Sequence, residues 1–69
     1  MKVYISDSLC LPQLVDDLLR GGCVPCAVDE RTLEVIHPSA EDATEARTEL
    51  TFFLRAWQSR HPDVELTYG

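Results

Sequence analysis

The sequence predicts an α+β protein in which two helices cover one face of an antiparallel sheet. Two segments place apolar residues three and four positions apart, as amphipathic helices do. Shorter segments alternate apolar and polar residues, as strands do. These segments follow one another in the order strand, helix, strand, strand, helix, strand, so the simplest arrangement is a two-layer sandwich.

An opening strand is expected at residues 2–6. Val3 and Ile5 occupy alternate positions there, so both side chains point to the same face of the sheet. Tyr4 lies between them and is expected on the other face, which the helices leave open to solvent.

The first helix is expected to begin on one side or the other of Leu11. Asp7 or Ser8 can cap its N-terminus, whereas Pro12 is tolerated only in a first helical turn. The pair Gly21-Gly22 ends the helix, because glycine adopts the left-handed backbone angles of a helix C-terminus. The apolar stripe expected to face the sheet consists of Leu11, Leu14, Val15, Leu18 and Leu19.

A hairpin is expected next, with strands at residues 23–28 and 32–37. The turn between them lacks glycine, which favours a type I turn with a bulge. Pro25 has no N–H to donate to a neighbouring strand, so its strand should lie at an edge of the sheet. Strand alternation is expected to turn Val24, Cys26 and Val28 toward the core, and Cys23, Ala27 and Ile36 away from it.

The second helix is expected to be capped by Ser39 and to run to about residue 60, shortly before Pro62. Glu41 and Asp42 place negative charge at its positive end. Its expected apolar stripe is Ala43, Ala46, Leu50, Phe53, Leu54 and Trp57. A last strand is expected at residues 64–68, where Val64, Leu66 and Tyr68 alternate with polar residues.

This element order, with right-handed crossovers, favours a βαββαβ sandwich that resembles the ferredoxin-like architecture. The resemblance covers the whole chain, residues 1–69, as one domain, and it implies the sheet order 4-1-3-2 with both helices on one face. It implies no particular activity, because this architecture carries many unrelated functions.

A narrower resemblance covers residues 14–28, where a leucine-rich helix ends in glycine and an apolar strand containing proline follows. This segment is similar to the corresponding helix and strand of small bacterial proteins described as signal-transducing or of unknown function. It is consistent with the fold and implies no activity.

Composition excludes several classes of partner. Twelve acidic and six basic residues give a formal charge of −6, which disfavours binding to nucleic acid or to an anionic membrane surface. No apolar run approaches the roughly 20 residues that span a bilayer. The sequence has three cysteines, which are too few for a disulfide framework, and an odd number cannot all be paired. We therefore expect a cytoplasmic protein.

The spacing Cys23-x-x-Cys26 occurs in zinc sites and in thiol redox centres. Here the pair follows the end of a helix and enters a strand, where residues three apart point to opposite faces. A structural role is therefore expected for both cysteines, and a metal- or thiol-handling protein that uses them remains the alternative.

The sequence contains no arrangement of residues typical of a catalytic site. Asp16 and Asp17 are expected on a solvated helix surface, and His37 is expected to find a local hydrogen-bond partner at the end of its strand. We therefore predict a protein that is not an enzyme and requires no cofactor.

Exposed apolar residues are the remaining functional signal. Phe52 lies about 145° around the second helix from the centre of its apolar stripe, so it should meet solvent. Tyr4 and Ile36, together with Ala27, are expected on the open face of the sheet. These residues predict an interaction or regulatory module that binds a protein partner or a second copy, through the open sheet face or the outer side of the second helix.

Overall fold

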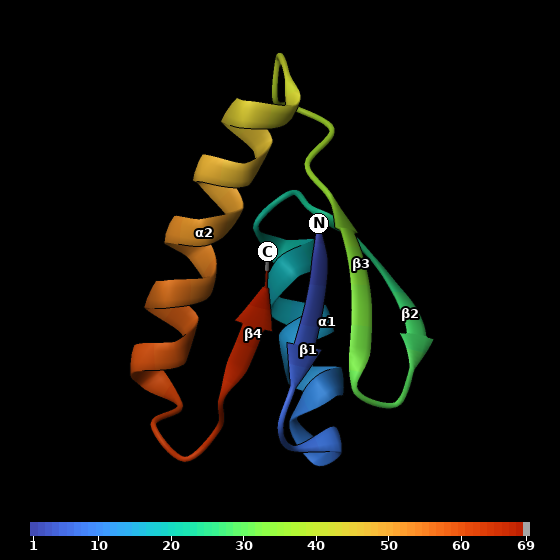
Figure 1. The fold of residues 1–69 in the computed structure, drawn as a ribbon, viewed down its shortest axis with the longest axis vertical. Coiled ribbons are helices and arrows are strands. Elements are labelled where there is room, and N and C mark those ends of the chain that lie inside the picture. The colour runs from blue at the N-terminus through green and yellow to red at the C-terminus, as the bar shows by residue number, and fades with distance from the viewer. Residues whose placement is uncertain (69) are drawn as a thin grey trace.

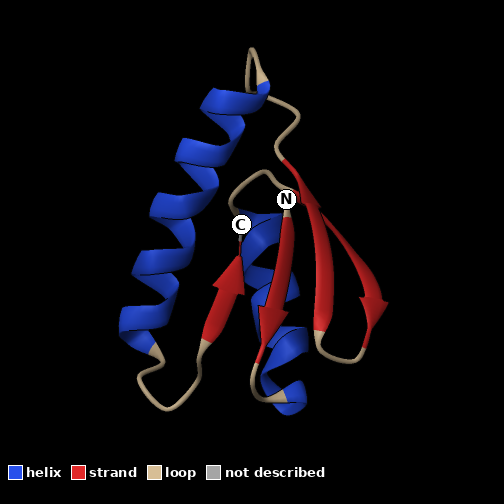
Figure 2. Cartoon of the chain, in the orientation of Figure 1, coloured by secondary structure: helices blue, strands red, loops and turns tan. Residues whose placement is uncertain are grey.

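The structure is a computed structural model that describes residues 1–68. Its elements follow the expected order, with one short 3₁₀ turn, η1 (Ser8–Cys10), ahead of the first helix (Figure 1). Figure 2 shows the helices and strands in separate colours. The strands are β1 (Lys2–Ile5), β2 (Val24–Asp29), β3 (Thr32–Ile36) and β4 (Leu66–Tyr68), and the helices are α1 (Leu11–Arg20) and α2 (Ala43–Arg60).

The four strands form one sheet in the order β2-β3-β1-β4, with every neighbouring pair antiparallel. An antiparallel α+β architecture is therefore confirmed, and the same order counted from the other edge is β4-β1-β3-β2. Pro25 lies in the edge strand β2, as its missing N–H requires.

Both helices contribute to one hydrophobic core with a single face of the sheet. Val3 and Ile5 of β1 and Leu33 and Val35 of β3 alternate into this core, and each is at most 3% exposed. The helices add Leu11, Leu14, Leu18, Leu50, Leu54 and Trp57. The core positions that the helical and strand periodicities predict are thus largely confirmed.

Helix α2 is longer than the sheet it covers. Its 18 residues span about 27 Å, whereas the longest strand has 6 residues. Figure 1 shows its N-terminal turns reaching past the ends of the strands. Ala43 is exposed there, so its expected place in the apolar stripe is wrong. The cap is Asp42, whose carboxylate accepts the Glu45 N–H at 2.8 Å, and not Ser39.

Helix α1 buries a narrower stripe than its sequence suggests. Leu14 and Leu18 are fully buried, but Leu19 is 56% exposed and is not a core residue. A ten-residue helix lying against one sheet face buries only the side chains nearest that face, and Leu19 lies beyond them.

The side chains of strand β2 point to the opposite faces of the sheet from those expected. Cys23 is 5% exposed and belongs to the core, whereas Val24, Cys26 and Val28 are exposed. The register pairs Val24 with Ile36 on the open face, while Ala27 is paired with Leu33, whose side chain faces the helices. Ala27 therefore does not belong to the open face.

The physical reason lies at the C-terminus of α1. Gly22 has a φ of 84°, its N–H donates to the Leu19 carbonyl, and the Cys23 N–H donates to the Leu18 carbonyl at 2.9 Å. This pair of bonds is a Schellman motif, in which the residue after the glycine commonly packs on the last turn of the helix. Cys23 is therefore turned inward toward Leu18, and this sets the alternation of the whole strand.

Candidate interaction surfaces

The outer side of α2 carries the most exposed aromatic side chain. Phe52 is 69% exposed, as its position on the helical wheel predicts. At 100° per residue, the exposed residues within about 60° of it form what we call the outer stripe. The outer stripe consists of Glu45, Thr48, Glu49, Phe52, Arg55, Ala56 and Ser59. It lies opposite Leu50, Leu54 and Trp57, which pack into the core.

A shallow groove of about 300 Å³ lies beside Phe52. It is lined by Arg47, Thr48, Thr51, Phe52 and Arg55, all of them from α2. An aromatic ring bordered by guanidinium groups and hydroxyl-bearing side chains is a typical composition for a protein contact, because aromatic residues and arginine are enriched at interfaces.

The open sheet face carries Tyr4 and Ile36, which are 47% and 58% exposed. Val24, paired with Ile36 and 47% exposed, adds to this face. Tyr4 is opposite Thr32, four residues from Ile36 along β3, or about 13 Å away. The charged residues Lys2 and Glu34, opposite each other in β1 and β3, lie between them. Tyr4 and Ile36 therefore form no continuous apolar patch on these two strands, and the exposed Cys26 lies opposite Glu34 in β2.

The structure does not bring Phe52 together with Tyr4 and Ile36. The outer stripe points away from the core on the helix layer, whereas Tyr4 and Ile36 lie on the sheet face opposite to that layer. The two surfaces proposed from the sequence are therefore separate, and each has to be judged by itself.

A larger groove of about 670 Å³ was not expected from the sequence. It lies where α2 extends beyond β3, and it is lined mainly by small and apolar residues, with His37, Asp42 and Arg47 among them. His37 Nδ1 is buried and has no hydrogen-bond partner among the described residues, so the expected local partner is absent. No nearby pattern in the sequence signals this groove, because it arises from the length of α2 relative to the sheet.

The cysteines do not converge on a common site. Cys23 lies in the core and burial raises the pKa of its thiol, whereas Cys26 is exposed on the open sheet face. Burial, and secondarily the neighbouring Asp7 carboxylate, raises the pKa of Cys10. Within residues 1–68, no group of three or more histidine, cysteine or acidic side chains is placed to hold a metal ion.

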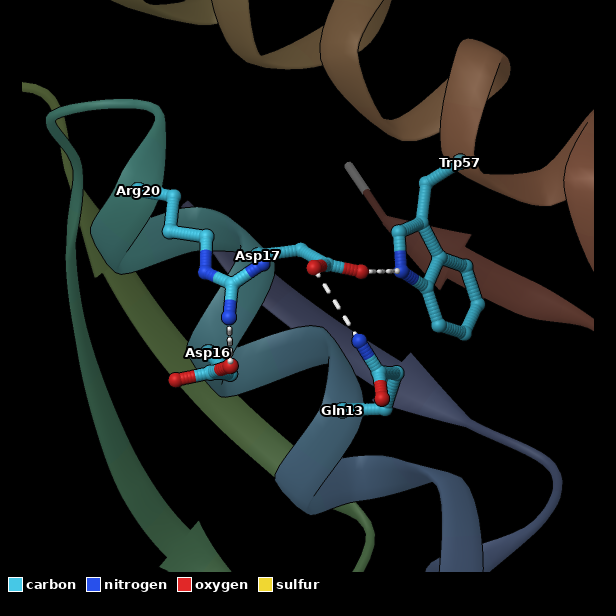
Figure 3. A network of polar contacts seen from close by, with 5 residues as sticks. All are labelled: Gln13, Asp16, Asp17, Arg20 and Trp57. Atoms are coloured by element: carbon cyan, nitrogen blue, oxygen red, sulfur yellow. Dashed lines mark hydrogen bonds and ion pairs between the residues drawn. The ribbon is translucent and has the colours of Figure 1, made fainter.

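The expectation that Asp17 lies on a solvated helix surface is wrong, because its carboxylate accepts hydrogen bonds from two other side chains. Its Oδ2 accepts the indole Nε1–H of Trp57 at 2.8 Å and its Oδ1 accepts the Gln13 amide at 3.1 Å (Figure 3). Asp16 behaves as the sequence suggests and forms an exposed ion pair with Arg20 at 3.2 Å. Asp17 is therefore a structural link between α1 and α2.

The hydrogen bond from Gln13, followed by that from Trp57, lowers the pKa of Asp17. A carboxyl whose folded pKa lies below its unfolded value of about 4 stabilises the protein above that value, and the stabilisation is lost as the pH falls through the folded pKa. We expect Asp17→Asn to lower the urea midpoint at neutral pH, and the difference from the parent protein to disappear in acid.

The measurement is a series of urea titrations from pH 7 to pH 2. Asp16→Asn is the matched control, since its carboxylate forms only an exposed ion pair in the same helix. A difference between Asp17→Asn and the parent protein that stays constant down to the lowest pH would contradict the assignment.

Across the described part of the chain, no helix has the combination of length and apolarity needed to cross a membrane. No family model matches the sequence, and no curated protein or solved structure matches it either.

Proposed function

We propose that this protein is a non-catalytic interaction module with a ferredoxin-like sandwich fold, and that it associates with a second copy of itself. The strand order and the shared core of the two helices support the ferredoxin-like assignment. A cytoplasmic location fits its three free thiols, which a reducing compartment keeps unpaired.

The observation that carries the proposal is Phe52. A phenylalanine that is 69% exposed on a 69-residue chain leaves apolar surface in water that association would cover. It lies at the centre of a continuous exposed stripe, whereas Tyr4 and Ile36 are divided by the Lys2–Glu34 pair. The outer side of α2 is therefore favoured over the open sheet face.

Sedimentation equilibrium over a range of micromolar concentrations tests this proposal. We expect the average mass of the parent protein to rise with concentration, and Phe52→Ser to remain monomeric. Tyr4→Ser is the matched control, because it removes an exposed aromatic ring from the other surface.

Association that survives Phe52→Ser but is lost in Tyr4→Ser or Ile36→Ser would move the contact to the open sheet face. A parent protein that stays monomeric up to several hundred micromolar would reject self-association.

A further inference from the structure

We infer that the second copy binds through the same outer stripe, so that the two α2 helices lie antiparallel across a two-fold axis at Phe52. This inference rests on the proposed self-association and specifies its geometry.

The first support is the shape of the outer stripe. Thr48, Ala56 and Ser59 are the small side chains around Phe52. Small residues beside one large ring let two helix backbones approach, while the two Phe52 rings pack against each other on the axis.

The second support is the distribution of charge along the stripe. Its N-terminal half carries Glu45 and Glu49, and its C-terminal half carries Arg55, with Arg60 just beyond. None of these four groups forms an ion pair with another residue in the range 1–68. Two antiparallel helices place the acidic half of each stripe against the basic half of the other, whereas two parallel helices would oppose like charges.

The register follows from placing Phe52 on the axis. Residues at equal distances before and after Phe52 are then level in the two copies. At 100° per residue, Glu45 and Arg60 lie about 20° and about 80° to the same side of Phe52, and they are level to within one position. Glu49 and Arg55 lie to opposite sides of Phe52 and do not meet. Arg60 of each copy therefore contacts Glu45 of the other, and the contact occurs twice. Such an isologous contact closes on itself and stops at a dimer. The antiparallel helix dipoles add to the attraction.

The contact area sets the expected affinity. A pair of helices about 27 Å long buries less than the ~1,200 Å² typical of tight complexes. We therefore expect a dissociation constant of about 10–100 μM, which corresponds to a reversible dimer.

Charge exchange between copies tests this geometry. Glu45→Arg alone opposes two guanidinium groups at each of the two contacts, and Arg60→Glu alone opposes two carboxylates at each. Each single variant should raise the dissociation constant about tenfold or more. In an equimolar mixture of the two variants, the heterodimer sets the two arginines of one copy against the two glutamates of the other. Opposite charges then meet at both contacts, so mixing should restore an affinity near that of the parent protein. The double variant Glu45→Arg/Arg60→Glu also pairs opposite charges at both contacts and should recover the homodimer.

Both positions are exposed, so the variants should keep the parent fold, which circular dichroism and urea midpoints verify. Glu30→Arg, an exposed change in the β2–β3 turn with the same change in net charge as Glu45→Arg, is the control for net charge. Recovery in both the double variant and the mixture supports the antiparallel pair, because two parallel helices would recover in the mixture alone.

The remaining outcomes separate this inference from the proposed function. If the parent protein dimerises but the double variant does not recover, the antiparallel geometry is wrong while self-association stands. If the parent protein does not dimerise, the proposed function fails and this inference fails with it.

Discussion

Replacing Trp57 with alanine should lower the free energy of unfolding by about 3–5 kcal/mol. The indole is completely buried, its N–H donates to Asp17, and its ring stacks on His61 with the centroids 3.9 Å apart. Alanine leaves a cavity between the layers and removes the link to α1. A domain of this size has little stability in reserve, so much of the chain should be unfolded at room temperature.

Urea denaturation followed by far-UV circular dichroism measures this loss, because the variant has no tryptophan to report by fluorescence. Phe52→Ala is the matched control, since it removes an aromatic ring from the exposed side of the same helix. It should change the free energy of unfolding by less than about 0.5 kcal/mol. Equal losses in the two variants would contradict the packing described for Trp57.

Gln58→Ala should lower the free energy of unfolding by about 2–3 kcal/mol. The Gln58 amide group donates to the carbonyls of His61, at 3.1 Å, and Val64, and its Oε1 accepts the Leu66 N–H at 2.8 Å. One side chain thus joins the end of α2 to the turn after it and to the start of β4. Without it, partly buried backbone groups lose their partners, and the three-residue strand β4 loses its anchor.

The loss should be accompanied by faster amide exchange in β4. Leu66 and Thr67 are the positions to follow by NMR, and Ser59→Ala is the control, because its hydroxyl makes only an exposed bond to Ala56. Unchanged exchange at Leu66 in Gln58→Ala would show that the side chain does not hold β4.

The order of elements and most of the core could be predicted from the sequence. Leu14, Leu18, Leu50 and Leu54 follow the helical period, and that period depends only on local backbone geometry. The same geometry predicts that Phe52 is exposed, and the missing N–H of Pro25 predicts an edge strand. These features follow from single residues and their near neighbours.

The faces of β2 could have been predicted from one further signal. The glycine pair after Leu18, followed by the apolar Cys23, matches the Schellman motif, in which the residue after the glycine packs back on the helix. Alternation counted from Cys23 as a buried residue places Cys26 on the open face. The alternation within the strand alone does not show which of its two sets of side chains is buried.

The sequence by itself determined the succession of helices and strands, most of the residues that fill the core and the isolation of Phe52 on the outer side of its helix. Only the tertiary structure decided that Asp17 meets Trp57, 40 positions away, that Gln58 holds β4, and that Lys2 and Glu34 lie between Tyr4 and Ile36 on the open face. Periodicity is a property of neighbouring residues, whereas these contacts depend on how far each element extends and where it rests against the others.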